Sequence, residues 1–461
     1  MVPGMKRRDA LKTMGALAGA AGAARVLPGC GDNAGARLPP GIHHVVVVMM
    51  ENRSYDHYLG ARALMGLPGD GLATTMSNLN GAGMAIPPYP ARFDDACVPD
   101  PPHGWSSSRS QFDGGTNGGF VRAHEASHGP GHSHPMQYMT RDLVPVHWAL
   151  ADHYGSCDRY FCSVMGPTWP NRMYWHSGSS GGIMSNQLPT EGFTWPSIHH
   201  RLDEAGVGWR YYYVDLPVLA IVNSLDTTNR VFYVEDFLRD AMTGNLPPVS
   251  YVDPGFSYND DHPPHHPIFG QQFIAAIYNA LAAGPLWEHC LLVVTYDEHG
   301  GFFDHVPPPT TVDDHAATGF DQMGFRVPTV VAGPYVKAGH VSSVVRDHTS
   351  VLRHLQDQFG LAPLNQRVSA ASDLSDLLDL DALAAGTPRP PAAIPAIEID
   401  ESRIGNECRG AARLQHDVLR MADEHPHLFR PWDRRAEILD AAYLIGDFLE
   451  TVNGGRIVRG R

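Results

Sequence analysis

Three short runs of apolar residues stand out along the chain, and each ends abruptly in polar residues or a sharp turn. They cover residues 43–50, 290–296 and 327–332, and the last ends at Gly333. Continuous apolar runs of this length, rich in β-branched residues, are typical of strands buried on both faces of a parallel sheet. The pattern therefore predicts a buried, mainly parallel sheet.

Segments with helical spacing lie between and after these runs, at residues 268–283 and 350–359. The alternation of strand and helix predicts an α/β fold, a doubly wound sheet with helices on both faces. Residues 67–134 are rich in Gly, Pro, Ser, Asn and His and show no sustained periodicity, which predicts long active-site loops. Four histidines at positions 124, 128, 132 and 134 are interpreted as part of a solvated loop.

The first two predicted strands each end in a pair of residues that can bind a metal ion. Glu51 and Asn52 follow one strand, and Asp297 and Glu298 follow the other. Ligands of such sheets bind beyond the carboxyl ends of the strands, and acids that converge there can share a cation that offsets their repulsion. The alternative is that each acid caps the helix that follows it.

The chain has 461 residues, 43% of them apolar and 18% charged, which indicates a folded protein with a sizeable core. We expect a catalytic domain over residues 41–365, followed by a linker and a helical C-terminal extension over residues 366–461. A Pro/Ala-rich stretch at 384–395 precedes an amphipathic stretch at 411–452 that predicts two helices. The sequence shows no internal repeat and no transmembrane helix.

The N-terminus reads as an export signal. Arg7 and Arg8 open a twin-arginine pattern, and a weakly apolar stretch follows to Leu27. The signal segment, residues 1–30, ends at Cys30 in a sequence that resembles a lipobox, so lipid anchoring at Cys30 and simple cleavage nearby are both open. We expect a protein that is periplasmic, secreted or lipid-anchored at the cell surface.

The net charge limits the classes of binding partner, and the cysteine content bears on the redox compartment of the protein. The formal charge of −15 argues against nucleic acid as a partner, since phosphate backbones are held by clustered Lys and Arg. Beyond Cys30 there are five cysteines without a CxxC pair, so no thiolate zinc site is predicted. An oxidising compartment permits disulfides, at least one thiol stays unpaired within the chain, and the pairing is open.

A rigid turn from Gly166 to Arg172 holds the hydroxyl of Thr168 between two prolines, with Asn171 and Arg172 close behind. Phosphoryl transfer needs an activated nucleophile together with donors to the phosphate oxygens, and Thr168 could be that nucleophile. A Thr between prolines is, taken alone, usually a structural turn residue. Among 26 histidines, His103 and His262 lie in loops stiffened by proline, which suits a general acid or a donor to phosphate.

At these residues the chain resembles the bacterial phosphoesterase family that holds phospholipases C and acid phosphatases, a branch of the alkaline phosphatase superfamily. The resemblance covers roughly residues 42–360 and consists of five stretches in the order of the family. They are HHVVVVMMENRSYDHY, PHGW, the stretch from Tyr138 that ends in GPTWPNR, DDHPP and TYDEHGGFFDHVPPP.

The resemblance implies a hydrolase that attacks phosphorus with Thr168 and forms a phosphothreonine intermediate, with a metal that lowers the pKa of the Thr168 hydroxyl. The metal would be a divalent ion such as zinc, calcium or iron, surrounded by Glu51, Asn52, Asp297, Glu298 and Thr168. His103, His262 and Asn171 would hold phosphate oxygens or protonate the leaving alcohol.

Three further positions bear on the resemblance. Asp304 and His305 match the family pattern without an assigned role, and His299 stands where phospholipase relatives often have Asn. Many phospholipase C relatives carry C-terminal β-rich modules. Here a helical tail is expected instead, which weakens the transfer of lipid specificity.

Three functions are weighed against one another. The favoured one is a phospholipase C that acts on phosphatidylcholine-type lipids, with peripheral membrane contact, because the context of Thr168 is closer to that branch. The alternatives are an acid phosphatase that acts on phosphomonoesters and a non-catalytic surface binding protein. The metal-type acids and the candidate nucleophile are present together, which argues against the binding protein.

Overall fold

The computed structural model describes residues 38–405, 408 and 416–458. Within them, eight strands form one sheet. In spatial order they are β12 (Val341–Ser342), β6 (Gly155–Cys157), β11 (Thr329–Ala332), β10 (Cys290–Tyr296), β1 (His44–Met50), β9 (Val249–Asp253), β7 (Trp209–Tyr213) and β8 (Val231–Tyr233).

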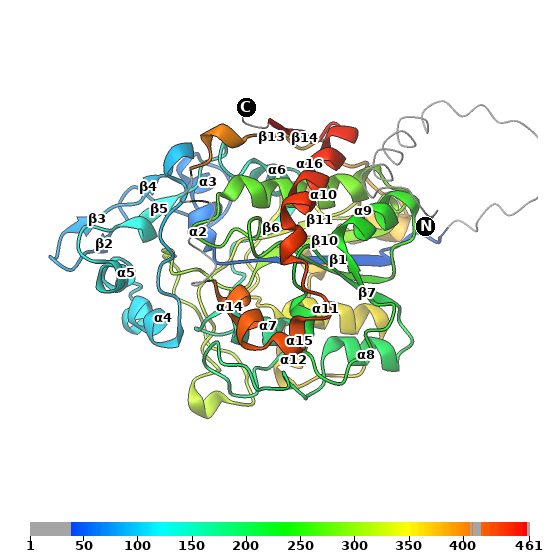
Figure 1. Ribbon diagram of the computed structural model, residues 1–461, viewed down its shortest axis with the longest axis horizontal. Coiled ribbons are helices and arrows are strands. Elements are labelled where there is room, and N and C mark those ends of the chain that lie inside the picture. Colours follow the sequence, from blue (N-terminus) through cyan, green and yellow to red (C-terminus); the bar gives the residue numbers. More distant parts are fainter. Residues whose placement is uncertain (1–37, 406–407, 409–415, 459–461) are drawn as a thin grey trace, which may run out of the picture.

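Helices cover both faces of this sheet, which confirms the doubly wound α/β prediction (Figure 1). One face carries α6 (Pro145–His153), α9 (Val234–Thr243), α10 (Pro267–Ala283) and α16 (Ile438–Thr451). The other carries α7 (Thr168–Ser177), α8 (Ile198–Glu204), α11 (Thr349–Phe359) and α14 (Asp417–Glu424). The two helices predicted at 268–283 and 350–359 are α10 and α11.

Strands β1 and β10 lie side by side in the middle of the sheet and run parallel, with His44 opposite Cys290 and Met50 opposite Tyr296. All seven residues of each are buried, as the apolar runs predicted. The pairing continues one residue further, because the Asp297 amide donates to the Met50 carbonyl at 3.2 Å. Residues that follow β1 and β10 are therefore brought together at one edge of the sheet.

The third predicted strand, β11, is present but runs antiparallel to β10 and to β6. A parallel return needs a crossover, usually a helix. Between β10 and β11 the chain forms only loops and one short 3-10 helix, Ala316–Thr318. The expectation of parallel strands is wrong at this position, and the end of β11 does not reach the edge where β1 and β10 end.

Residues 67–134 are less irregular than predicted. They contain α4 (Trp105–Phe112), α5 (Phe120–His128) and short strand pairs, and lie at one end of the molecule (Figure 1). His124 is not solvated, because its side chain is fully buried and its Nε2 lies 3.2 Å from His134 Nδ1. The solvated-loop interpretation is wrong for this residue.

The C-terminal part packs onto the same core as the sheet. It contains α14, α15 (Pro426–Phe429) and α16, where two helices were predicted, and a parallel pair of strands, β13 (Ile397–Asp400) and β14 (Gly455–Val458). The residues of this part that join the main core include Ile397, Ile399, Val418, Leu419, Phe429 and Phe448. Extensive burial of this kind ties the extension to the region before it.

Cys97 and Cys408 form a disulfide across 311 residues of sequence. Cys157, Cys162 and Cys290 are buried free thiols. Arg7, Arg8 and Cys30 lie outside the described residues. Among the residues that are described, none of the helices is both long and apolar enough to cross a membrane.

The pairing of β1 with β10 should dominate stability. We expect Leu292→Ala in β10 to lower the free energy of unfolding by about 2–5 kcal/mol, because it leaves a cavity in a buried strand. Denaturant unfolding followed by circular dichroism measures the loss. Leu380→Ala is the matched control, since Leu380 is 57% exposed, and a change below about 0.5 kcal/mol is expected there. Equal effects in the two variants would contradict the assignment of the core.

Candidate active site

Two carboxylates and one arginine form the base of the candidate site. Glu51 and Asp297 extend from β1 and β10, and Arg172 comes from α7. The Arg172 Nε donates to Asp297 Oδ2 at 3.1 Å and its Nη2 donates to Glu51 Oε2 at 3.3 Å. All three side chains are fully buried. A buried cation of this kind is needed to hold two acids so close together.

The pKa values of the carboxylates are raised in spite of the nearby Arg172. Burial and the charge of Asp297 raise the pKa of Glu51 well above its usual value, against the opposing effect of Arg172. Burial likewise raises the pKa of Asp297 to about 6, and burial raises the pKa of Glu298 well above its usual value. Of the three acids, Arg172 contacts only Glu51 and Asp297, and the pKa values of all three stay raised, so the site can accept a further positive charge.

Thr168 is the first residue of α7, with Pro167 at the N-cap. Its hydroxyl oxygen lies 3.4 Å from Glu51 Oε1 and 3.4 Å from Asp417 Oδ2. The free backbone N–H groups at the start of a helix favour negative charge nearby. The predicted nucleophile is therefore placed between two acceptors, at a helix end suited to an anion.

Asn171 does not have the role predicted for it. Its amide nitrogen donates to the carbonyls of Gly166 and Pro167 at 3.0 and 3.1 Å, and its side-chain oxygen accepts from the Val164 amide at 3.0 Å. The side chain is thereby used up in fixing the turn before Thr168. Asn171 positions the hydroxyl and has no free donor for a phosphate oxygen.

Asn52 follows Glu51 in a left-handed conformation, with φ of 62°, which Asn tolerates better than most residues. Its backbone N–H donates to Asp297 Oδ1 at 3.1 Å. Its side-chain oxygen is buried without a hydrogen-bond partner among the described residues. A Cβ at Gly300 would come within 2.2 Å of the Asn52 carbonyl oxygen, so the loop after β10 needs glycine to approach this closely.

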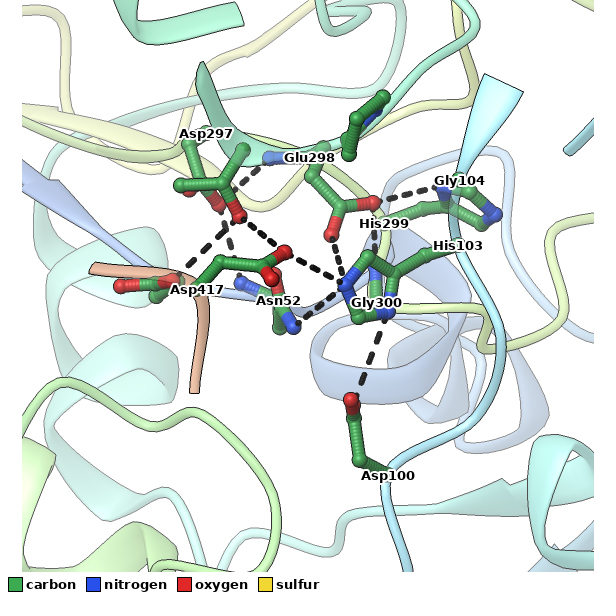
Figure 2. A network of polar contacts seen from close by, with 12 residues as sticks. Asn52, Asp100, His103, Gly104, Asp297, Glu298, His299, Gly300 and Asp417 are labelled. Atoms are coloured by element: carbon green, nitrogen blue, oxygen red, sulfur yellow. Dashed lines mark hydrogen bonds and ion pairs between the residues drawn. The ribbon is translucent and has the colours of Figure 1, made fainter. Parts of the chain in front are cut away.

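His103 lies beside Glu298. Its Nδ1 donates to the Pro101 carbonyl at 2.7 Å, which directs Nε2 toward the site. Nε2 is 3.6 Å from Glu298 Oε1 and 3.4 Å from Asp417 Oδ2. Figure 2 shows the imidazole with Asp100 on one side and these acids on the other. Burial lowers the pKa of His103, but the surrounding acids outweigh burial and raise it well above its usual value, so the ring is an imidazolium.

His262 is oriented in the same way as His103, but its pKa is shifted in the opposite direction. Its Nδ1 donates to the Pro263 carbonyl at 2.5 Å, and its Nε2 is buried without a partner among the described residues. The ring centroid lies 6.1 Å from that of His103. Burial and the neighbouring His416 lower the pKa of His262 well below its usual value. His262 is therefore neutral, with a lone pair available on Nε2.

Two site residues come from the C-terminal extension and were missed in the sequence. The His416 Nε2 donates to Asp260 Oδ2 at 2.6 Å, and its ring stacks on His262 at 4.2 Å. Asp417 contacts both Thr168 and His103. Neither residue follows an apolar run or belongs to a stretch that resembles the family. Without the fold, nothing in the sequence marks them.

Three groups of histidines and acids bring ligand atoms within 4.8 Å of one another. They are Glu51 with His262 and His416, Asp100 with His103 and His262, and Asp260 with His265 and His416. In two of them His416 is not a suitable ligand. Its Nδ1 accepts from the Val418 amide at 3.2 Å, so Nε2 carries the hydrogen and has no lone pair.

The oxygen atoms at the strand ends fit a divalent cation better. Glu298 Oε1 and Asn52 Oδ1 are both buried without hydrogen-bond partners among the described residues, and a cation would offset the cost of burying several carboxylates together. Hard and borderline cations prefer such oxygen ligands. The residues that would hold the ion are Glu51, Asn52, Thr168, Asp297 and Glu298.

Asp304 and His305 lie outside this site. Asp304 accepts from Arg326 at 2.9 Å, and the His305 Nδ1 lies 2.7 Å from Asp56 Oδ2, within one buried ion-pair network. His299 lies behind Glu298, with its Nδ1 3.0 Å from Glu298 Oε2 and its Nε2 2.8 Å from Gln111 Oε1. These residues support the loop after β10 and the orientation of Glu298.

Comparison with known proteins places this site in a family. The sequence matches the Phosphoesterase family over residues 42–362. Phospholipase C A of Mycobacterium tuberculosis is 31% identical over 384 residues, 69% of this chain and 73% of that protein. Non-specific phospholipase C1 of Arabidopsis thaliana is 36% identical over 333 residues, 65% of this chain and 62% of that protein.

A solved protein of the alkaline phosphatase superfamily from Vibrio parahaemolyticus aligns over 80% of this chain and 79% of its own, with a TM-score of 0.38 and 10% identity. The protein described here is a hydrolase that acts on phosphoester bonds. It belongs to the phosphoesterase family, which confirms the resemblance seen in its motifs.

The excess of negative charge predicts a pH-dependent response to cations. Because the pKa of Asp297 is raised to about 6, the folded state without a cation is favoured at low pH, and this contribution is lost as pH rises through about 6. A divalent cation binds the ionised acids. The rise in Tm on adding zinc, calcium or ferrous ion should therefore be larger at pH 7.5 than at pH 5.

Asp297→Asn should abolish most of this cation-induced rise in Tm, while Asp381→Asn, an exposed acid elsewhere, should keep it. Differential scanning calorimetry with each ion measures the response. A rise that is independent of pH, or that survives in Asp297→Asn, would show that the cation binds elsewhere.

Proposed function

We propose that this phosphoesterase is a metal-dependent phospholipase C, which cleaves the phosphodiester of phosphatidylcholine-type lipids through a phosphothreonine at Thr168. The observation that carries the proposal is the placement of the Thr168 hydroxyl at the start of α7, between Glu51 and Asp417, with His103 in contact with Asp417. The relatives named phospholipase C support the choice of substrate.

The ion would supply a Lewis acid beside the Thr168 hydroxyl and lower its pKa. Glu51, Asn52, Asp297 and Glu298 would hold it. Arg172 opposes the protonation of Glu51 and Asp297 and orients them, because it donates to one oxygen of each. Asn171 holds the turn that presents Thr168.

In the first step Thr168 attacks phosphorus and the diacylglycerol alcohol leaves. Glu51 Oε1 is an acceptor for the hydroxyl proton at 3.4 Å in the free protein. The His103 imidazolium donates from Nε2, either to a phosphate oxygen or to the leaving alcohol. The start of α7 adds backbone N–H groups near the charge that develops on the phosphoryl oxygens.

In the second step water hydrolyses the phosphothreonine. His262 is neutral and its Nε2 lone pair is unused, so it can accept a proton from that water. A protonated and a neutral histidine, 6.1 Å apart between ring centroids, thus divide the acid and base roles. The leaving phosphate ester in this scheme is phosphocholine.

We further propose that the protein is exported, and the Cys97–Cys408 disulfide supports this because such bonds persist mainly in oxidising compartments. In a bacterial host, Arg7→Lys with Arg8→Lys should keep the protein in the cytoplasm with both thiols reduced. Cell fractionation and mass spectrometry after thiol alkylation measure both, with Arg25→Lys as control. Export of the double variant at the wild-type level would contradict the twin-arginine assignment.

Removal of the nucleophile tests the reaction. Thr168→Ala should lower kcat on a chromogenic phosphocholine diester by roughly 1000-fold or more, since nucleophile and metal ligand are lost together. With phosphatidylcholine vesicles, the wild type should release phosphocholine and diacylglycerol. Acid quench during turnover, followed by peptide mass spectrometry, should find phosphocholine esterified to Thr168.

Thr243→Ala is the matched control, because Thr243 is exposed at the end of α9 and should leave the rate unchanged. Turnover by Thr168→Ala near the wild-type rate would rule out the threonine mechanism. A wild type that hydrolyses only phosphomonoesters would instead identify a phosphatase. A folded, metal-free protein inactive on both substrates would identify a binding protein.

A further inference from the structure

We propose that Asp417 is a specificity-determining residue, which makes the site favour singly charged phosphodiesters over doubly charged phosphomonoesters. The inference rests on the proposed function, because it assumes that Thr168 attacks the phosphoryl group. It concerns a carboxylate from the C-terminal extension, outside the residues that match the family.

The position of the carboxylate carries the inference. Asp417 Oδ2 lies 3.4 Å from the Thr168 hydroxyl oxygen and 3.4 Å from His103 Nε2. A phosphoryl group that is attacked by Thr168 and bonded to His103 must lie between the same two atoms. The phosphate oxygens therefore come close to the Asp417 carboxylate, and Figure 2 shows Asp417 directed toward His103.

The carboxylate is built into the molecule. Asp417 is the first residue of α14, and its backbone carbonyl accepts from the Trp169 indole nitrogen at 3.3 Å, next to the nucleophile. His416 caps the helix through Nδ1 and is itself fixed by Asp260. The buried residues Val418 and Leu419 anchor the same turn in the main core. The start of α14 is thus held firmly, and Asp417 lies beside the position that the phosphoryl group would take.

The charge on Asp417 is held by its neighbours. Arg420 Nη2 donates to Asp417 Oδ1 at 2.9 Å, on the side away from Thr168. This ion pair with an arginine favours the charged form of the Asp417 carboxylate. The side chain is therefore an anion that faces the substrate.

The total charge of the substrate then decides how strongly it is repelled. A phosphodiester carries one negative charge, whereas a phosphomonoester carries nearly two above its second pKa of about 6. At a separation of about 4 Å in a partly buried site, the extra charge is worth enough to change binding tenfold or more. A neighbouring carboxylate therefore weakens the binding of the monoester more than the binding of the diester. The second ester group of the diester is uncharged and is not repelled.

Substitutions of Asp417 and of its ion-pair partner Arg420 should change substrate specificity in opposite directions. Asp417→Asn removes the negative charge, and the ratio of kcat/KM for a chromogenic phosphomonoester to that for a chromogenic phosphocholine diester should rise at least about tenfold at pH 8. Arg420→Gln removes the compensating positive charge, so the same ratio should fall. A role in stability alone would not give effects of opposite sign.

Inhibition by anions that are not substrates measures binding to the site without the chemical step. Inorganic phosphate, doubly charged at pH 8, should inhibit Asp417→Asn about tenfold more tightly than it inhibits the wild type. Singly charged dimethyl phosphate should change by less than about threefold. Asp423→Asn is the matched control, because it removes the same charge from an exposed position on α14 and should leave both constants unchanged.

An unchanged ratio in both variants, or shifts in the same direction, would overturn the inference. If Asp417→Asn does not fold, the direction of the shift in Arg420→Gln decides. Thr168→Ala is measured in parallel: full activity in that variant refutes the proposed function, whereas an inactive Thr168→Ala with an unchanged Asp417→Asn ratio refutes the specificity role alone.

Discussion

The site depends on the burial of Glu51 and Asp297 side by side at the ends of two paired strands. Hydrogen bonding between β1 and β10 fixes the backbone of both acids, so they cannot separate to relieve their repulsion. Arg172 makes the arrangement possible, because it binds one oxygen of each. The helix that carries Arg172 also begins with Thr168. The charge that stabilises the acids and the hydroxyl of the proposed nucleophile are therefore positioned by the same ten-residue helix.

The two histidines show how similar local structures give different chemistry. His103 and His262 each use Nδ1 to bind a backbone carbonyl in a proline-containing loop, which directs Nε2 into the site. His103 has acids around it and holds a proton, whereas His262 lies against His416 and stays neutral. Because the covalent context is so alike, the difference lies in what the fold brings next to each ring.

Features encoded within a short stretch of sequence could be predicted, and features created by long-range packing could not. The strand ends at Glu51 and Asp297 follow apolar runs directly, so both their burial and their meeting were foreseen. The direction of β11 depends on how the loop after β10 returns, which its composition does not reveal. Asn171 lies next to the nucleophile, and only the turn geometry shows that its amide is already occupied.

The C-terminal residues His416 and Asp417 could not be predicted from the sequence, because their role also depends on long-range packing. They lie about 120 residues beyond Asp297 in an amphipathic stretch whose pattern reports only a helix. Their chemistry arises because α14 packs beside Trp169. Tertiary contact of this kind has no counterpart in the order of motifs along the chain.

The disulfide between Cys97 and Cys408 has a consequence for how the enzyme comes into being. One cysteine stands six residues before His103 and the other eight residues before His416. When Glu51, Thr168 and Asp297 have been synthesised, Asp417 has still to be added to the chain. A chain released before residue 417 would contain residues 42–362, which match the family, and yet lack the Asp417 carboxylate beside Thr168. Completion of synthesis, more than formation of the sheet, defines the moment at which this site takes its final form.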